Sequence, residues 1–295
     1  MPGALSSARW RETAMDAPPP DLEPLKLYHW PAANFGDTLS ARVVAWISGR
    51  EVVNVRPKSA ELFAIGSLIH VLAKHFTDPP NRPHRPILWG TGVLNPIFRR
   101  EFLDNLDIRL MRGPVGAAIC RVPATAFGDP GLLAPDALGA AAARQDRVAV
   151  IPHHSQMEDP AIGAMVATDP RLHLVDPRQS PEVVCAAIAS AAHVVSASLH
   201  GLIVADAYGV ANTWMDPSAQ GLMKYHDYAA SVGRYMLAPV AIDEVPRLAA
   251  RAATGPLPYA DGIAAARAAL ISHFPDELRA NPTMRPAVQT AAAMT

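Results

Sequence analysis

The chain has 295 residues, of which half are hydrophobic and 18% are charged. This balance excludes a predominantly disordered chain, and the length suits two domains of ordinary size. The formal net charge of −1 provides no overall field to attract nucleic acid or an anionic membrane, and the apolar stretches are too short to span a bilayer.

The first half of the chain alternates short apolar runs with amphipathic stretches, which is typical of βαβ units and a parallel sheet. Residues 1–24 lack apolar periodicity, so we expect a disordered N-terminal tail. The pattern then predicts strands at 25–30, 51–55, 62–65, 86–89 and 108–111, and helices at 37–47, 98–105 and 115–121. These elements form a first Rossmann-like domain, residues 25–143.

An alanine-rich segment precedes a second block, residues 144–276, in which the alternation repeats, and a C-terminal tail follows at 277–295. The predicted strands are 147–151, 172–175, 193–196 and 212–215, with helices at 181–192 and 199–208 and a returning helix at 261–273. The fold class is therefore α/β, with two Rossmann-like domains that face each other across a cleft. Open α/β folds bind ligands beyond the carboxyl ends of their strands, so residues that directly follow strands are the candidates.

Three motifs follow strands in the first domain. Asn34-Phe-Gly-Asp37 opens a helix and could hold an anion or a polar substrate, although a simple N-cap explains it at least as well. Trp89-Gly-Thr-Gly92 lacks the third glycine of a dinucleotide fingerprint, so we do not expect NAD, and a tight turn accounts for it almost as well as a site. Arg112 could bind carboxylate or phosphate oxygens with two parallel hydrogen bonds, or pair with a carboxylate at the surface.

The second domain contributes histidines and a lysine. His153 and His154 end a strand and point in different directions, so at most one faces a ligand and metal chelation is not expected. Ser196-Ala-Ser-Leu-His-Gly201 is the strongest signal, because His200 lies in the first turn of a helix. There the helix dipole lowers the pKa of the imidazole and a bound phosphate raises it again, which suits proton exchange. Lys224 could add a second cation.

The order and spacing of these motifs resemble the polysaccharide pyruvyl transferase family over about residues 25–243, most closely the branch that forms ketals on exopolysaccharides. The motifs that carry the resemblance are Asn34-Phe-Gly-Asp37, Gly66-Ser67, Gly90-Thr91-Gly92, Arg112-Gly-Pro114, Gly128-Asp129, His153-His154 and Ser198-Leu-His-Gly201. The resemblance implies a glycosyltransferase-B-like pair of Rossmann-like domains. It also implies phosphoenolpyruvate as donor and a glycan as acceptor of the enolpyruvyl group.

The same resemblance assigns roles to the candidate residues. It implies that Arg112 binds donor oxygens, that His200 is the central catalytic residue and that Lys224 assists at the phosphate. The other expected substrate-binding residues are Asn34, Asp37, Gly66, Ser67, Gly90, Thr91, Gly92, His153, His154, Ser196 and Ser198. We expect no metal and no cofactor apart from the donor substrate.

Two positions depart from the family pattern. Ser198 stands where many relatives carry an arginine, which removes an anion contact and leaves the identity of the donor open. Gly116 replaces a residue that frequently carries a hydroxyl group.

Two other functions remain open at this stage. One is a nucleotide-sugar glycosyltransferase on the same architecture, although the second domain offers no convincing glutamate pair to hold a donor ribose. The other is a glycan-binding relative without catalysis. The N-terminal sequence has no recognisable export signal, so we expect a cytoplasmic protein. A transient association with the inner membrane, to meet a lipid-linked acceptor, is left open.

Overall fold

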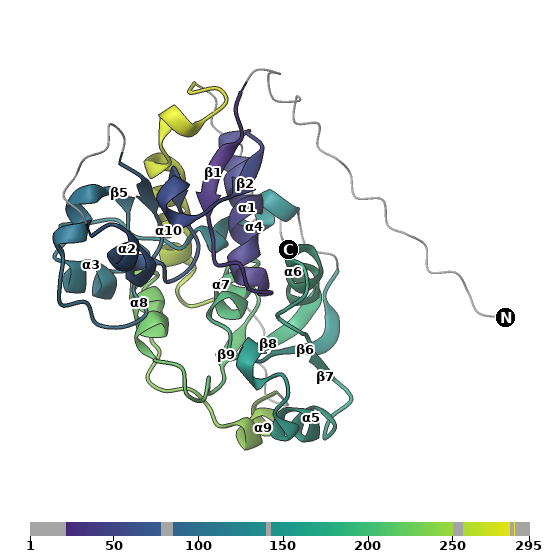
Figure 1. Ribbon diagram of the computed structural model, residues 1–295. Helices are drawn as coiled ribbons and strands as arrows, with labels where there is room; N and C mark the ends of the chain where they lie inside the picture. Colours follow the sequence, from purple (N-terminus) through teal and green to yellow (C-terminus); the bar gives the residue numbers. More distant parts are fainter. Residues whose placement is uncertain (1–21, 78–84, 140–142, 250–255, 284–285, 287–295) are drawn as a thin grey trace.

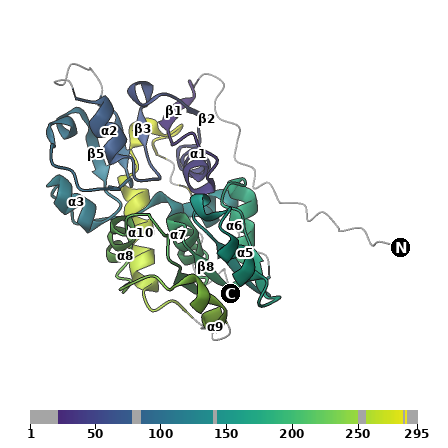
Figure 2. The same cartoon turned by 60° about the horizontal axis from the view of Figure 1, so that its bottom comes forward.

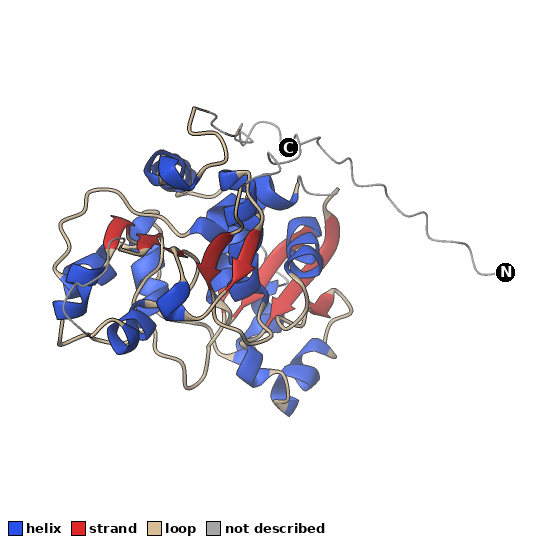
Figure 3. Ribbon diagram, turned by 45° about the horizontal axis from the view of Figure 1, so that its top comes forward, coloured by secondary structure: helices blue, strands red, loops and turns tan. Residues whose placement is uncertain are grey.

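The computed structural model describes residues 22–77, 85–139, 143–249, 256–283 and 286 (Figure 1). Most of the predicted N-terminal tail, 1–24, and most of the predicted C-terminal tail, 277–295, lie outside the described residues. The described part contains two parallel sheets, and strands flanked by helices are visible in Figure 3.

The first sheet occupies the upper part of Figure 1. Its strands, in spatial order, are β2 (Val52–Asn54), β1 (Leu25–Tyr28), β3 (Leu62–Phe63), β4 (Ile87–Trp89) and β5 (Asp107–Leu110), all paired in parallel. The connecting segments contain α1 (Phe35–Ser48), α2 (Ile69–His75) and, after β5, α3 (Pro114–Cys120) and α4 (Ala134–Leu138). Every residue of β4 is buried, as expected for a strand that is covered on both faces.

The second sheet lies at the lower right of Figure 1. Its parallel strands, in spatial order, are β7 (Leu172–Leu174), β6 (Gln145–Ile151), β8 (Ala191–Ser196) and β9 (Asn212–Trp214). Its helices are α5 (Pro160–Val166), α6 (Pro181–Ser190), α7 (Leu199–Ala207), α8 (Met223–Ser231) and α9 (Val245–Ala249). The two sheets confirm the predicted α/β class with Rossmann-like units, whereas the glycosyltransferase-B likeness and the domain limits 25–143 and 144–276 stay predictions.

The two sheets are joined by a shared hydrophobic core. Helix α1 contacts both α4 and α6, and it begins where the Asn34 side chain accepts a hydrogen bond from the backbone N–H of Gly36 at 3.1 Å. Every residue of α7 is buried, including His200 and Asp206, so this mostly apolar helix lies inside the molecule. The largest core cluster contains side chains of α1, α6 and α7 together.

The last long helix, α10 (Ala260–His273), crosses from the second sheet to the first. The indole N–H of Trp89, at the end of β4, donates to the carbonyl of Leu270 at 2.9 Å. Beyond α10, Arg279 donates to the carbonyl of Ile47 at 2.9 Å, and the N–H of Ala280 donates to the carbonyl of Ser48 at 2.7 Å. The start of the predicted C-terminal tail therefore packs against the end of α1.

Two differences from the predicted elements matter for the site. The predicted helix at 98–105 is wrong, because only a 3₁₀ turn at Glu101–Asn105 forms there. Phe98 is 87% exposed whereas Phe102 is buried, so no continuous apolar face spans the segment. Helix α8 was not predicted at all, because its sequence is mostly polar and offers few apolar residues that would mark a buried face. Its Tyr225 and Tyr228 are fully buried, and tertiary contacts therefore stabilise it.

Candidate active site

The candidate residues gather where the strand order of each sheet reverses. In the first sheet β1 lies between β2 and β3, and in the second sheet β6 lies between β7 and β8. The chain therefore adds one strand on one side of β1 or β6 and the later strands on the other side. Loops that leave such neighbouring strands in opposite directions form the crevice in which open α/β sheets bind ligands. Residues 34–37 and 66–67 follow β1 and β3, and residues 153–154 and 196–200 follow β6 and β8.

The His200 imidazole links the two halves of this site. It lies in the first turn of α7 and packs against Gly36 at the start of α1, so closely that a Cβ atom at Gly36 would overlap the ring. The side chain is 8% exposed, and its Nε2 atom is buried with no hydrogen-bond partner among the described residues. Burial, then the charges of Arg112 and Lys224, lower the pKa of His200 to about 3. The imidazole is therefore neutral in the free protein.

Asp37 and Lys224 are a buried acid and a buried base near this imidazole. Both side chains are 9% exposed. Burial raises the pKa of Asp37 to about 7, against the opposing effects of the Lys224 charge and a hydrogen bond with Asn34. Burial and the Arg112 charge lower the pKa of Lys224 to about 8, while Asp37 opposes that shift. At neutral pH the site thus holds a mostly charged ammonium group and a carboxyl group that is ready to gain or lose a proton.

His153 and His154 lie at the end of β6, with ring centroids 4.1 Å apart. His153 is buried, and its Nδ1 atom is 2.7 Å from the Ser155 hydroxyl, whereas His154 is exposed. Burial, together with the charges of His154 and Lys224, lowers the pKa of His153 to about 4, and burial and Lys224 lower that of His154. The charge of Lys224 therefore lowers the pKa of both rings. That at most one of the two histidines faces a ligand stays a prediction.

Arg112 is completely buried and its donors are engaged within the protein. Its Nε atom donates to Asp227 Oδ2 at 3.0 Å, Nη1 donates to the Ser67 hydroxyl at 2.9 Å and Nη2 donates to the Val93 carbonyl at 3.0 Å. The arginine does pair with a carboxylate, but in the interior and not at the surface. Because the described groups already surround the guanidinium, direct contact with donor oxygens stays a prediction.

The small residues of the predicted site mostly shape its loops. The Thr91 hydroxyl donates to the Gly66 carbonyl at 2.6 Å, and the Gly92 N–H donates to the same oxygen at 3.1 Å, which joins the loops after β3 and β4. Gly90 bonds back to β5 through Leu110. The Ser196 hydroxyl is fully buried and lies within hydrogen-bond distance of two carbonyl acceptors, that of Ile151 on the neighbouring strand β6 at 3.1 Å and that of Ser198 at 2.9 Å. Ser198 is the N-cap residue of α7. Ser67 is half-buried and therefore more accessible than Thr91 or Ser196.

Two carboxylates near the site had no predicted role. Asp227 is fully buried in α8 and pairs with Arg112, at a separation in sequence that no local pattern reveals. Asp129, in the Gly128-Asp129 motif, is also fully buried, and its Oδ2 atom has no partner among the described residues. Burial raises the pKa of Asp129 to about 6, although the Arg112 charge opposes the shift. Its place in a motif was a signal that could have marked it.

A family model for polysaccharide pyruvyl transferases matches residues 20–218, which include both strand-order reversals. The chain belongs to the polysaccharide pyruvyl transferase family. Membership implies a transferase that acts on polysaccharide. No curated protein matches the chain significantly. The matched region ends before α8, so Lys224, which the sequence analysis had singled out, and Asp227, which had no predicted role, both lie outside it.

Two properties of the described residues bear on cofactors and membranes. Within them, histidine, cysteine and carboxylate side chains form no group that could hold a metal ion. None of the helices in this part of the chain combines the length and the apolar character that crossing a membrane requires.

Proposed function

We propose that this pyruvyl transferase moves the enolpyruvyl group of phosphoenolpyruvate onto a sugar diol of a glycan, as a pyruvate ketal. The observation that carries the proposal is the buried, unpartnered Nε2 atom of His200, which lies near Lys224 and Asp37 where the two strand-order reversals meet. An unpaired buried polar atom costs free energy, and such atoms persist where a ligand completes them.

The donor is an anion with a phosphate and a carboxylate group, and the site offers it two kinds of contact. Lys224 supplies a buried positive charge, and Ser67 supplies a half-buried hydroxyl group. The N-termini of α1 and α7 add positive ends of helix dipoles close to His200. Arg112 stabilises this arrangement from behind, because it donates to the Ser67 hydroxyl from the interior.

Proton transfer then follows from the pKa values of the site. Donor binding brings negative charge next to His200 and raises the pKa of its imidazole, so the ring can take up a proton and deliver it to the methylene carbon of the donor. Carbon 2 becomes electron-deficient, and a sugar hydroxyl attacks it and loses its proton. Asp37, whose pKa is about 7, is suited to accept that proton.

The remaining step closes the ring. The bond between carbon 2 and the phosphate oxygen breaks, and the electron pair leaves with the phosphate group. A neighbouring sugar hydroxyl then bonds to carbon 2, and its proton passes to the released phosphate. The proton that Asp37 gained replaces the one that His200 gave, so the net reaction converts phosphoenolpyruvate and a diol into a ketal and inorganic phosphate without a redox change.

The test is phosphate release from phosphoenolpyruvate in the presence and absence of acceptor glycans. Release that depends on a glycan supports the proposal and excludes a purely glycan-binding protein. In parallel, the melting temperature is measured with phosphoenolpyruvate and with UDP-sugars, because a ligand that binds the folded state stabilises it. Stabilisation by UDP-sugars alone, without glycan-dependent phosphate release, would refute the proposal and favour a glycosyltransferase.

A further inference from the structure

Asp227 connects α8 to the first half of the site. Its Oδ2 atom accepts from Arg112 at 3.0 Å, and its Oδ1 atom accepts from the backbone N–H of Gly116 at 2.8 Å, in the first turn of α3. The backbone is equally close, since a Cβ atom at Gly113 would overlap the Asp227 carbonyl. Figures 1 and 2 both show α8 beside α3. The carboxylate therefore bonds both the Arg112 side chain and the backbone of the α3 first turn, within one loop-and-helix segment.

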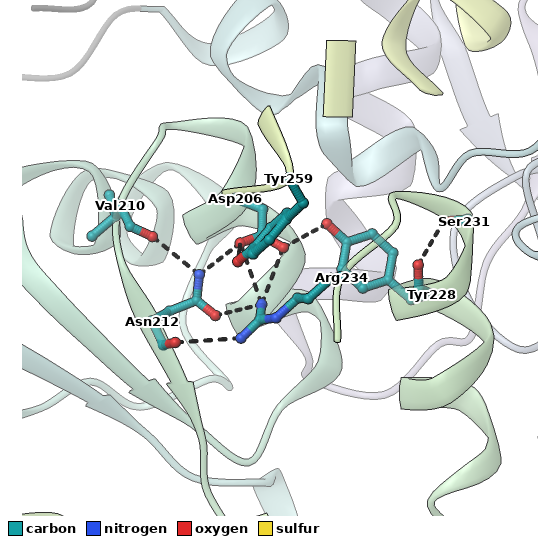
Figure 4. Close-up of polar contacts among 7 residues, drawn as sticks. All are labelled: Asp206, Val210, Asn212, Tyr228, Ser231, Arg234 and Tyr259. Atoms are coloured by element: carbon teal, nitrogen blue, oxygen red, sulfur yellow. Dashed lines mark hydrogen bonds and ion pairs between the residues drawn. The ribbon is translucent and has the colours of Figure 1, made fainter. Parts of the chain in front are cut away.

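The same helix is also fastened to the second half of the site. The Tyr225 hydroxyl donates to the carbonyl of Ala197 at 2.5 Å, three residues before His200. The Tyr228 hydroxyl donates to Asp206 at 2.8 Å, at the other end of α7, and Figure 4 shows these two side chains pointing toward one another. Helix α8 thus bridges the Arg112 loop and the His200 helix, and Lys224 lies on it one turn before Asp227.

We propose that Asp227 is a positioning residue for donor binding: by holding Arg112 and the start of α3, it sets where α8 presents Lys224 to the anion. A lysine ammonium on a flexible stem binds an anion well only if its helix is held in place. This inference rests on the proposed function, and it adds a residue outside the region that the family model matches. Asp227 itself is fully buried and does not need to touch the donor.

The variant Asp227→Asn keeps the side-chain shape but removes the charge that pairs with Arg112. We expect the KM for phosphoenolpyruvate to rise by about 10-fold, because a displaced Lys224 ammonium weakens its contact with the anion without removing it, and the effect stays at the low end of what the loss of a charge-assisted contact causes. We expect kcat at saturating donor to change far less, because His200 is left intact. Both constants are measured by glycan-dependent phosphate release.

The matched control is Asp136→Asn, which breaks another ion pair with a fully buried carboxylate. Asp136, in α4, bonds Arg267 of α10 at 2.8 Å. This control should lose thermal stability as Asp227→Asn does but keep the wild-type KM. An equal rise of KM in both variants, or an unchanged KM in folded Asp227→Asn, would overturn the inference.

A second variant covers the case in which Asp227→Asn does not fold. Replacing the pair together, Arg112→Met with Asp227→Leu, substitutes apolar groups for a buried ion pair, which is often neutral for stability. A KM raised to the value of Lys224→Gln, but not above it, supports the positioning role. An unchanged KM, or a further rise through the lost contact of Arg112 with the Ser67 hydroxyl, refutes it. The wild-type protein is measured in the same assay. If the wild type is inactive, the proposed function is refuted, and the assay then does not test the positioning role of Asp227. For that outcome, the affinity for phosphoenolpyruvate measured by calorimetry in wild type and Asp227→Asn decides the positioning role.

Discussion

Two buried arginine–aspartate pairs of this protein have different surroundings. Arg234 Nη1 lies 3.1 Å from Asp206 Oδ2. The Asp206 carboxylate also accepts hydrogen bonds from the Tyr228 and Tyr259 hydroxyl groups and from the Asn212 side-chain amide (Figure 4). Arg112 and Asp227 are 3.0 Å apart, but near them the described residues leave polar atoms of His200 and Asp129 without partners. The ion pair alone therefore does not identify a site. A lone unsatisfied atom does not identify one either, because His193 Nδ1, near the Arg234 pair, also lacks a partner among the described residues. What distinguishes the Arg112 pair is that the unsatisfied atom of His200 lies near a buried lysine, Lys224, beyond the strands where the order of each sheet reverses.

The largest expected effect tests the unsatisfied atom itself. His200→Ala should lower kcat by about a hundred- to ten-thousandfold, the usual contribution of general acid–base catalysis, while the fold is retained. The measurement is glycan-dependent phosphate release, with circular dichroism to check folding. The matched control is His193→Gln, a buried imidazole of β8 that bonds Thr213 at 2.9 Å and should keep normal turnover. Normal turnover in folded His200→Ala would remove His200 from the mechanism.

The next effect concerns the cation of the site. Lys224→Gln removes a charge-assisted contact worth roughly 1.5 to 3 kcal/mol, so the affinity for phosphoenolpyruvate should fall by about 10- to 100-fold in calorimetry. Because the pKa of Lys224 is about 8, the wild-type affinity should fall as pH rises through 8 and the ammonium loses its proton. Lys224→Arg should remove this pH dependence, since arginine stays charged. A flat wild-type profile between pH 7 and 9.5 would contradict the assignment.

A smaller effect is expected on the pH dependence of the free energy of unfolding, to which the two buried histidines contribute. Burial lowers the pKa of His193 to about 4 and that of His200 to about 3, from 6.5 for an unfolded chain. The folded state therefore favours the neutral rings, and the stability that this provides is present above pH 6.5 and lost as pH falls toward 4. Each of His193→Gln and His200→Gln should flatten the acid side of the profile, by up to about 1.4 kcal/mol per pH unit. Denaturant unfolding between pH 4.5 and 7.5 measures this, and profiles parallel to wild type would refute it.

The smallest effect is expected for the hydrogen-bond network around Asp206, in which each carboxylate oxygen has partners. Tyr259→Phe removes one hydroxyl that donates to Asp206 at 2.8 Å and leaves the Arg234 pair in place. We expect a loss of about 1 kcal/mol in the free energy of unfolding. The KM for phosphoenolpyruvate should stay at the wild-type value. A KM change as large as that of Asp227→Asn would show that the two networks are not functionally distinct.

Much of the site could be predicted because parallel sheets bring the residues after their strands to one edge. Asn34-Phe-Gly-Asp37 and Ser196 to Gly201 each follow an apolar run, so their positions at a sheet edge follow from local sequence. The local sequence did not predict whether the side chains of these loops are exposed. Thr91 and Ser196 turned out fully buried with bonded hydroxyl groups, because loops from neighbouring strands bond each other, and a single chain segment does not reveal its neighbour.

The sequence by itself determined the alternation of strands and helices, the α/β class, the family resemblance and the order of the motifs along the chain. These depend on local periodicity and on residues close in sequence. Only the tertiary structure decided that Arg112 is sealed against Asp227, that an unforeseen helix carries Lys224, and that His200 is neutral. Those properties arise from burial and from charges that lie far apart in sequence, 115 residues for Arg112 and Asp227, and no local pattern encodes such contacts.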